Sequence, residues 1–599
     1  MSDTRDITKR GGHENSGGQN ADHGQGSQVT GDNSVSVSIQ VSSVDIDQQT
    51  PYFVDGRIAC TATTFSIFLA YFFKSLAGFT ILNNFVTVWT KKLNYSLHDA
   101  EEYRMIYTGV SSSLEVIGGI AADTYPGPFG TLGVTYVFFI IGAILMQIAT
   151  SLPLSLVSDL WTLQQIAWSS VVFLLLGQTG MSVILSVLAA EQVTQTRAKS
   201  NTFHWVYFST NAAGLLNSVL TIMILFTSTT EAVEADTIPA PISILLSGMI
   251  VCLVRSRYKT YVEEGFSLIK TIKTKAAHLR DRYGPKPQPI PKTKNPFSPP
   301  KKVLKTFAKI LCVNTSVFGF GIIYTQALGT FQLQATGLNT TIGQVNIDDP
   351  SAFVLLFNEV IILLTIPFLI NVVYRNFRRK GKKISVFVRM AIGMACTAGS
   401  GFSALLVEVA RRNDCTQHGG QSTLTVLIQA PQVILLGLGE VFTVISAWEY
   451  VYTEAPKGLK FTAMGLFYTV YGLTFFASYG FLKLIENTRP DWHPRGDICR
   501  PGNVGHMELL YMVLLCLLVG FFIIFLLVVL CLKSLRVDGR LRMLRAQNAG
   551  DIDRPLLAGS DETEGLRGRN DALGTSRSYD TFPTYESINQ QPDIPAIQN

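Results

Sequence analysis

Ionisable side chains interrupt several long apolar stretches of this chain, and the most isolated of them is Lys74. It lies in the run FLAYFFKSLAGF (68–79), and the nearest charged residues along the chain are Arg57 and Lys91. At about 1.5 Å per helical residue, each is roughly 25 Å away, which is farther than a lysine stem can extend. If the run spans a membrane, the Lys74 ammonium must face protein or a water-filled cavity, which is typical of a functional site.

Three glutamates also lie inside long apolar stretches, and a carboxylate there is a natural partner for an ammonium group. Glu359 lies in one apolar stretch, and Glu440 and Glu449 lie in another. The nine-residue spacing of Glu440 and Glu449 places them on different faces of a helix. We expect Glu449 to line a cavity; for Glu440 the alternative is a buried structural pair.

The whole chain has the composition of a polytopic membrane protein. Its 599 residues are 47% hydrophobic and only 15% charged, with a mean hydropathy of +0.27, whereas soluble domains carry about 25% charged residues. Twelve apolar windows are long enough, except for a short sixth one, to cross a bilayer as helices: 58–90, 104–122, 132–150, 163–190, 203–228, 240–254, 306–330, 352–374, 384–410, 423–453, 461–485 and 508–533.

The windows form two groups of six, which predicts an all-α membrane protein with two six-helix bundles. We expect residues 1–54 to form a disordered cytoplasmic tail and residues 55–254 the N-terminal bundle. A basic, proline-rich cytoplasmic linker (255–305) then leads to the C-terminal bundle (306–535). Residues 536–599 are expected to form a second disordered cytoplasmic tail.

The placement of basic residues predicts which ends of the spans face the cytosol. With twelve spans, the linker and the basic clusters at 374–383, 455–460 and 533–545 fall on the side of both termini, as the positive-inside rule requires. The opposite side collects two glycosylation sequons and two loop cysteines: Asn94, Asn339, Cys415 and Cys499. The cysteines can form a disulfide if that side is oxidising.

No motif of an enzyme or a metal site is placed where it could act. The chain has no Walker loop, HExxH or GxSxG arrangement suited to chemistry, and its eight cysteines show no metal-ligand spacing. We expect no enzymatic activity, no cofactor, no bound metal and no nucleic-acid partner. A six-plus-six chain with a cytoplasmic linker is instead the plan of the major facilitator fold, in which two bundles rock about a cavity at the membrane midplane.

Three stretches resemble sequence blocks of the proton-coupled oligopeptide transporter family (solute carrier family 15). They are GGIAADTYPGPFGT (118–131), NTFHWVYFSTNAAGLLN (201–217) and LGLGEVFTVISAWEYVYTEAPKGLKFTAMGLF (436–467). The resemblance covers about residues 55–535 and leans toward the peptide/histidine transporter branch. The family's hinge motif falls on three residues at the end of the second window: Gly118, Gly119 and Asp123. Glycines there permit close helix approach, and the aspartate can cap or pair.

The resemblance also implies roles for residues in the second half. Asn358 falls on the family asparagine that contacts the peptide backbone, and Glu449 on the glutamate that holds the substrate's amino terminus. Tyr324 and Gln326 fall in a segment that contributes polar contacts to the substrate. For Asn358 and Gln326 the alternative is a hydrogen bond between helices.

The chain departs from the family in the residues that imply proton coupling. The family's first-span Glu-x-x-Glu-Arg motif falls on Ala70, Phe73 and Lys74, so both acids are absent. The lysine that replaces the arginine keeps the charge but lacks the bidentate fork. In the fourth window Gly180 stands where the family has a lysine.

Proton coupling needs a titratable group that responds to substrate or to conformation. The N-terminal half offers Lys74, Glu115 and His204; we expect Glu115 near the cytoplasmic end of its span and His204 at the membrane interface. One hypothesis is that Lys74 binds the substrate carboxylate alone, without coupling. A second is that Lys74 pairs across the cavity, and titrates as a unit, with one of three acids: Glu359, Glu440 or Glu449.

The C-terminal tail contains three short patterns that resemble endosomal and lysosomal sorting signals read by adaptor proteins. DRPLL (553–557) has Asp553 ahead of the dileucine Leu556 and Leu557. YDTF and YESI place an apolar residue three positions after Tyr579 and Tyr585. They favour an endosomal or lysosomal membrane, with the plasma membrane as the alternative.

The sequence therefore predicts a secondary active transporter that moves histidine or small peptides from the lumen or exterior to the cytosol, coupled to protons. Two alternatives stay open: a degenerate transporter that acts as an endolysosomal scaffold or sensor, and an uncoupled facilitator of another amine-bearing solute. The expected partners are histidine or small peptides, protons, the lipid bilayer and an adaptor protein on the tail.

Overall fold

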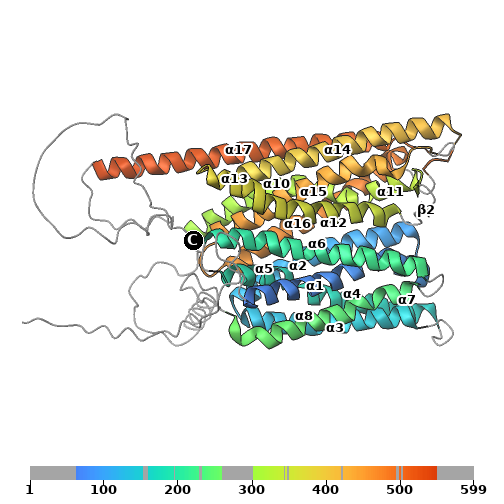
Figure 1. The fold of residues 1–599 in the computed structure, drawn as a ribbon, viewed down its shortest axis with the longest axis horizontal. Helices are drawn as coiled ribbons and strands as arrows, with labels where there is room; N and C mark the ends of the chain where they lie inside the picture. The colour runs from blue at the N-terminus through green and yellow to red at the C-terminus, as the bar shows by residue number, and fades with distance from the viewer. Residues whose placement is uncertain are drawn as a thin grey trace, which may run out of the picture. The chain divides into compact units, whose positions relative to one another are not determined.

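The bilayer interior offers no partner for free backbone N–H and C=O groups, so apolar stretches of spanning length form helices. The computed structural model describes residues 62–152, 159–193, 196–227, 232–258, 301–342, 345–346, 350–382, 384–419, 422–493, 498–500 and 504–548. All of them belong to one unit, Tyr52–Asn599. The described residues are almost entirely helical, and the long helices run along a common direction (Figure 1).

The N-terminal half contains the helices that correspond to the first six windows. They are α1 (Ala62–Thr87) with its π-helical continuation η1 (Val88–Lys92), α2 (Leu97–Asp123), α3 (Gly127–Ser151), α4 (Leu160–Gln178), α5 (Met181–Glu191), α6 (Thr196–Thr227), α7 (Ala232–Thr237), α8 (Pro239–Val254) and η2 (Arg255–Arg257).

The fourth window is broken into α4 and α5 at Gly180. This residue has a φ of +86°, a left-handed conformation that glycine adopts without steric cost. It also lies against α2, because a Cβ atom on Gly118 would be only 2.3 Å from the Gly180 Cα. A new helix N-terminus therefore forms inside the N-terminal half, facing α2.

The C-terminal half contains α10 (Lys301–Ala327), α11 (Thr330–Thr336), the strands β1 (Thr341–Ile342) and β2 (Val345–Asn346), α12 (Pro350–Phe368), η3 (Leu369–Val373), α13 (Tyr374–Arg379), α14 (Val386–Gln417), η4 (Val426–Gln429), α15 (Ala430–Glu454), α16 (Lys460–Thr488), η5 (Pro490–Trp492) and α17 (Met507–Asn548). The two strands pair antiparallel, with Thr341 opposite Asn346. In α12 the ring of Pro367 interrupts the hydrogen-bond ladder shortly before the π-helical η3.

Two predicted boundaries in this half are wrong. The C-terminal half begins its first helix at Lys301 rather than at 306, so the end of the predicted linker is helical. The last helix, α17, continues to Asn548, beyond the predicted start of the tail at 536, and in Figure 1 it reaches past the other helices. The added residues are rich in Leu, Arg and Ala, which favour helix even where the sequence has become polar.

Eleven helices within the described residues are long and apolar enough to cross a membrane. They match every predicted window except 203–228, which forms the 32-residue helix α6 but contains several polar residues. The sixth window was wrongly predicted to be short, because the candidate span there is Ala235–Arg257, 23 residues long. The number of twelve spans stays a prediction.

The two halves meet chiefly through α2 against α16 and α6 against α12. Glycines permit the first of these contacts: a Cβ atom on Gly119 would lie 2.4 Å from the Phe461 carbonyl oxygen, and one on Gly465 would lie 2.6 Å from the Val116 Cα. Outward-facing apolar side chains such as Leu253, which is 77% exposed, suit a lipid environment.

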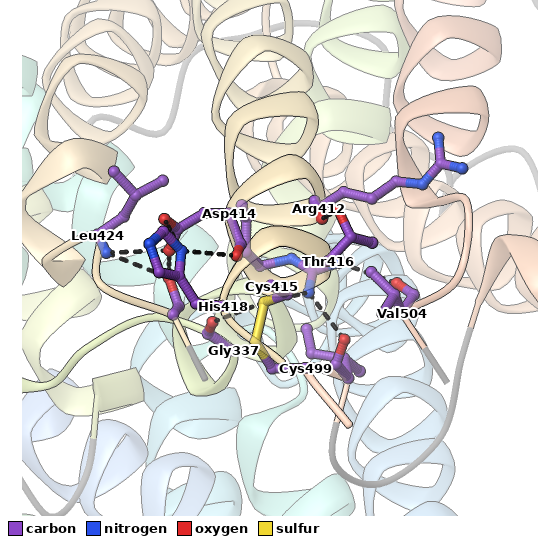
Figure 2. Close-up of a disulfide and its surroundings, with 12 residues drawn as sticks. Gly337, Arg412, Asp414, Cys415, Thr416, His418, Leu424, Cys499 and Val504 are labelled. Carbon is purple, nitrogen blue, oxygen red and sulfur yellow. Dashed lines mark hydrogen bonds and ion pairs between the residues drawn. A yellow bond between two sulfur atoms is a disulfide. The ribbon is translucent and has the colours of Figure 1, made fainter. Parts of the chain in front are cut away.

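A disulfide joins the end of α14 to the connection between α16 and α17 (Figure 2). The Cα atoms of Cys415 and Cys499 are 5.3 Å apart. Close by, the fully buried Arg411 donates hydrogen bonds to the Glu408 carboxylate and, over 2.8 Å, to the Ile498 carbonyl oxygen. The loop that carries Cys499 is therefore held both covalently and by a buried guanidinium.

Replacing Cys415 by serine should lower the free energy of unfolding by about 2–4 kcal/mol, because the disulfide closes a loop of 84 residues. Thermal unfolding of the purified protein in detergent measures the change. Cys516→Ser is the matched control, since Cys516 is an exposed free cysteine. Equal melting temperatures for the two variants would contradict the prediction.

Candidate functional site

Glu440, on α15, is the centre of a polar cluster between the two halves. Its carboxylate accepts a hydrogen bond from the Tyr207 hydroxyl on α6 and another, 3.1 Å long, from Asn358 Nδ2 on α12. Glu440 is only 5% exposed, and both donors are neutral. Among the described residues, no cation forms an ion pair with Glu440.

Glu359 is a second carboxylate of the same kind, one residue beyond Asn358 on α12. It accepts a 3.0 Å hydrogen bond from Ser218 on α6 and lies close to the α6 backbone, since a Cβ atom on Gly214 would be 2.4 Å from Glu359 Oε1. Its charge interacts with that of Glu440. In the described part of the chain the hydrogen-bond donor to Glu359, Ser218, is likewise neutral, so two acids here lack a counter-ion.

Aromatic side chains connect this cluster to the N-terminal half. The ring of Tyr324, on α10, lies 6.0 Å from that of Tyr471, on α16, and the charge of Glu440 acts on both tyrosines. One turn before Tyr471, the hydroxyl of Tyr468 is 3.5 Å from that of Tyr71 on α1. Hydroxyl groups thus line the boundary between the halves.

Lys74 is buried in the N-terminal half. Its ammonium therefore faces protein, which is one of the two surroundings expected for a lysine far from other charges along the chain. Its Nζ donates a 2.7 Å hydrogen bond to the Ser182 Oγ on α5 and lies 5.8 Å from the centre of the Tyr71 ring. The acid whose charge acts on it is Glu115, on α2. Glu115 is itself buried against α5, where its carboxylate accepts hydrogen bonds from the backbone N–H groups of Ser182 and Val183.

The hypothesis that Lys74 pairs with an acid of the C-terminal half is therefore wrong in this structure. Glu359 and Glu440 are held by α6 and α12, and Glu449 has its own cation. The break at Gly180 brings α5 and α2 together, so the nearby acid comes from the same half. The predicted position of Glu115 near the cytoplasmic end of its span stays a prediction; its side chain is buried, and its charge acts on Lys74.

Glu449 is also not a free carboxylate. Arg389, on α14, contacts it over 2.6 Å, and the Ser200 hydroxyl of α6 donates a 2.8 Å hydrogen bond to it. His204, one turn after Ser200, is buried and lies 5.6 Å from the Tyr374 ring. The sequence pattern does not single out Arg389, because this residue follows the basic cluster at 374–383 by only six residues.

The side-chain amide of Gln326 also has hydrogen-bond partners within the protein. Its Nε2 lies within hydrogen-bond distance of the Ser478 Oγ on α16, and its Oε1 accepts a hydrogen bond from Thr330. Because it is fully buried and bonded on both sides, it joins helices of the C-terminal half. Of the sequence-derived candidates, Tyr324, Asn358 and Glu440 come together at one place, and Gln326 and Glu449 are used elsewhere.

Polar contacts hold α2 to α16 at both ends. At one end Asp123 accepts hydrogen bonds from the backbone N–H groups of Phe461 and Thr462, of 3.4 and 2.6 Å, in the first turn of α16. At the other end Lys483, on α16, contacts Glu102 on α2 and lies 3.0 Å from the His98 Nε2.

His98, Glu102 and Glu486 are near enough to one another to hold a metal ion. The ammonium group of Lys483, however, contacts Glu102 and lies 3.6 Å from the Glu486 carboxylate. The chain thus places its own cation among these groups, and the cluster is better understood as a link between the halves.

Asn94 and Asn339 are exposed, and Asn94 has a positive φ of 59°. Glycosylation there stays a prediction. The sorting patterns around Asp553, Leu556, Leu557, Tyr579 and Tyr585 lie outside the described residues.

Comparison with known proteins identifies a family model and several relatives. A family model described as PTR2: POT family matches residues 288–493. The chain is 24% identical to "Protein NRT1/ PTR FAMILY 5.12" of Arabidopsis thaliana over 496 residues, which cover 74% of this chain and 87% of the relative. It is also 24% identical to "Protein NRT1/ PTR FAMILY 8.2" of the same organism over 501 residues, with coverage of 73% and 88%.

Solved structures of POT transporters have the same fold. The POT family transporter PepTSo superposes with a TM-score of 0.56 at 16% identity, covering 79% of this chain and 98% of that chain. A POT family transporter in complex with a thioalcohol conjugated peptide gives a TM-score of 0.55 at 15% identity, covering 80% and 98%.

The protein is therefore a multi-pass, all-α membrane protein with a transporter fold of the major facilitator type, and the predicted fold class is confirmed. The family model, the curated relatives and the solved structures all show similarity to the POT family. These relatives are transporters, not enzymes, in agreement with the expectation that the chain has no enzymatic activity.

Replacing Arg389 by methionine should lower the free energy of unfolding by about 1–3 kcal/mol, because it leaves the Glu449 carboxylate without its cation in a mostly buried position. Adding Glu449→Gln should restore part of that loss, since no uncompensated charge remains. Thermal unfolding in detergent of both single variants and the double variant tests this. Strictly additive losses would show that the two side chains do not interact.

Proposed function

We propose that this chain is a proton-coupled secondary transporter that carries histidine or small peptides from the lumen or exterior to the cytosol. The observation that carries the proposal is Glu440, a carboxylate between the two halves with neutral donors and no cation among the described residues. A buried carboxylate without a counter-ion either takes up a proton or binds a cation, and an α-amino group supplies such a cation.

The opposite charge for a zwitterionic substrate comes from the N-terminal half. Lys74 is the buried cation there, and the line of tyrosine hydroxyls between Tyr71 and Tyr324 offers hydrogen bonds between the two charges. Asn358 adds an acceptor, since its buried Oδ1 has no hydrogen-bond partner among the described residues. A peptide or amino acid has the ammonium, carboxylate and N–H groups that such an arrangement recognises.

The related solved transporters bind ligands of compatible chemistry. One was determined with a thioalcohol conjugated peptide and another with 5-aminolevulinic acid. We assign the chain to the peptide/histidine branch of the family because of the sequence blocks described above. The tail patterns favour endosomal or lysosomal membranes and adaptor binding.

A second candidate function is facilitated transport of an amine that lacks a carboxylate. It is favoured because, among the described residues, the buried cation already has partners and the buried acids do not have a cation. Lys74 has Ser182 and Glu115 beside it. Glu440 and Glu359 have only neutral donors in the described structure. The scaffold alternative rests on the tail patterns, which lie outside the described residues.

Cells that express the chain with Leu556, Leu557, Tyr579 and Tyr585 replaced by alanine should take up labelled histidine or the dipeptide Ala-Ala at their surface. Uptake should be faster at about pH 5.5 than at about pH 7.5, because an inward proton gradient then drives it. Histamine, which lacks the carboxylate, is the comparison substrate.

Uptake of histamine alone would favour the amine facilitator over the peptide and histidine transporter. Equal uptake at both pH values would contradict proton coupling. Absence of uptake of all three compounds, with the protein present at the surface, would overturn the transporter proposal.

Glu440→Gln should reduce uptake by about tenfold or more, because the neutral amide cannot balance a substrate ammonium. Glu449→Gln is the matched control: the same change in the same helix, at a carboxylate that Arg389 already neutralises. Its uptake, normalised to surface protein, should stay within about threefold of the unaltered chain. The opposite ranking of the two variants would restore Glu449 as the residue that binds the amine.

A further inference from the structure

Glu115 and Lys74 form a charged centre that the family motif does not anticipate. Glu115, on α2, is 3% exposed and Lys74, on α1, is 8% exposed. Both reach the first turn of α5: Ser182 Oγ accepts from the Lys74 Nζ over 2.7 Å, and the Glu115 carboxylate accepts from the Ser182 and Val183 N–H groups over 3.4 Å each. Three helices thus converge on one acid and one base.

Gly180 makes this convergence possible. Its left-handed conformation ends α4 and starts α5, and its lack of a side chain lets α2 approach at Gly118. The free N–H groups of the new helix start then point toward Glu115 and favour its ionised form. Gly180 therefore has two effects: it stands where the family has a lysine, and it creates the helix start that binds the Glu115 carboxylate.

The surroundings of Glu115 contain few other titratable groups. Lys74 and Tyr71 face it from α1, and Tyr468 faces it from α16. The two other helices packed along α2 in this half, α3 and α4, contain no charged side chain. Among these groups of the described structure, Lys74 is the cation whose charge acts on Glu115.

We propose that Glu115 is the proton-binding residue of the transport cycle, and this proposal rests on the proposed function. When a substrate carboxylate binds Lys74, one ammonium faces two carboxylates in a water-poor site and cannot neutralise both. Glu115 then takes one proton from the outer side and becomes neutral. When the substrate leaves on the inner side, Glu115 releases that proton and interacts with Lys74 again, so each cycle moves one proton with one substrate.

The arrangement also links the proton to the motion of the halves. Tyr71 precedes Lys74 by one helical turn, and its hydroxyl lies 3.5 Å from that of Tyr468 in the other half. The carbonyl oxygen of Glu115 and the backbone of Val116 lie against Gly465 of α16. A change of charge at Glu115 therefore occurs at the contact where α2 and α16 must separate.

The test uses the purified full chain in liposomes, with labelled Ala-Ala and labelled histidine as probes. Accumulation driven by an inward pH gradient is compared with counterflow, in which unlabelled substrate inside exchanges for label without a gradient. Glu115→Gln should lower accumulation by about tenfold or more and leave counterflow within about threefold, because exchange needs no net proton movement. Glu508→Gln, a carboxylate change beside Arg412 at the start of α17, should alter neither.

Accumulation by Glu115→Gln equal to that of the unaltered chain would overturn the proposal for Glu115 alone. Failure of the unaltered chain in both assays would instead overturn the proposed function. If Glu115→Gln loses both activities, the affinity for Ala-Ala in detergent is measured from about pH 5.5 to about pH 8. An affinity that no longer varies with pH supports the assignment, and pH dependence like that of the unaltered chain overturns it. Glu115→Asp should keep the pH dependence.

Discussion

A charge inside a membrane must be neutralised by the protein that contains it, and this constraint organises the structure. Lys74 lies near Glu115, Arg389 near Glu449, and Arg411 near Glu408. Each of these centres balances its own charge within one half of the molecule. Glu440 and Glu359 do not, because only neutral donors reach them among the described residues. Carboxylates buried between the halves without a cation must bind a proton or the cationic group of a ligand.

Under the proposed function, the donors to this site link binding to conformation. Tyr207 and Ser218 reach Glu440 and Glu359 from α6, across the boundary between the halves. A ligand that replaces these donors weakens the contact of α6 with α12 and α15. The polar links at the two ends of α2 and α16, at Asp123 and around Lys483, must then break in turn for either side to open. The link at Asp123 lies beside Gly119, where α2 and α16 approach closely.

Much of the fold could be predicted from the sequence, because spanning windows depend on local composition alone. The site was harder, since helical periodicity shows which residues share a face but not which helix lies opposite. Glu449 was predicted to hold the substrate's amino terminus, and its partner Arg389 lies in another span, which periodicity does not reveal. For Gln326 the sequence left a substrate contact and a hydrogen bond between helices open, and its amide lies within hydrogen-bond distance of Ser478 on α16. Lys74 was correctly expected to be buried, but its neighbour Glu115 became visible only with the helix break.

The position of Glu115 helps to distinguish the hypothesis of a working transporter from that of a degenerate one. The absence of acids at Ala70 and Phe73 looked like the loss of coupling, yet an acid from α2 now lies near the lysine that took the place of the arginine. Buried ion pairs are seldom retained for stability, because apolar residues of similar volume usually stabilise a protein as well or better. A chain that served only as a scaffold would gain by replacing both Lys74 and Glu115 with apolar residues. Their presence, with a broken helix that orients them, favours a role in which the charge of the pair changes during function.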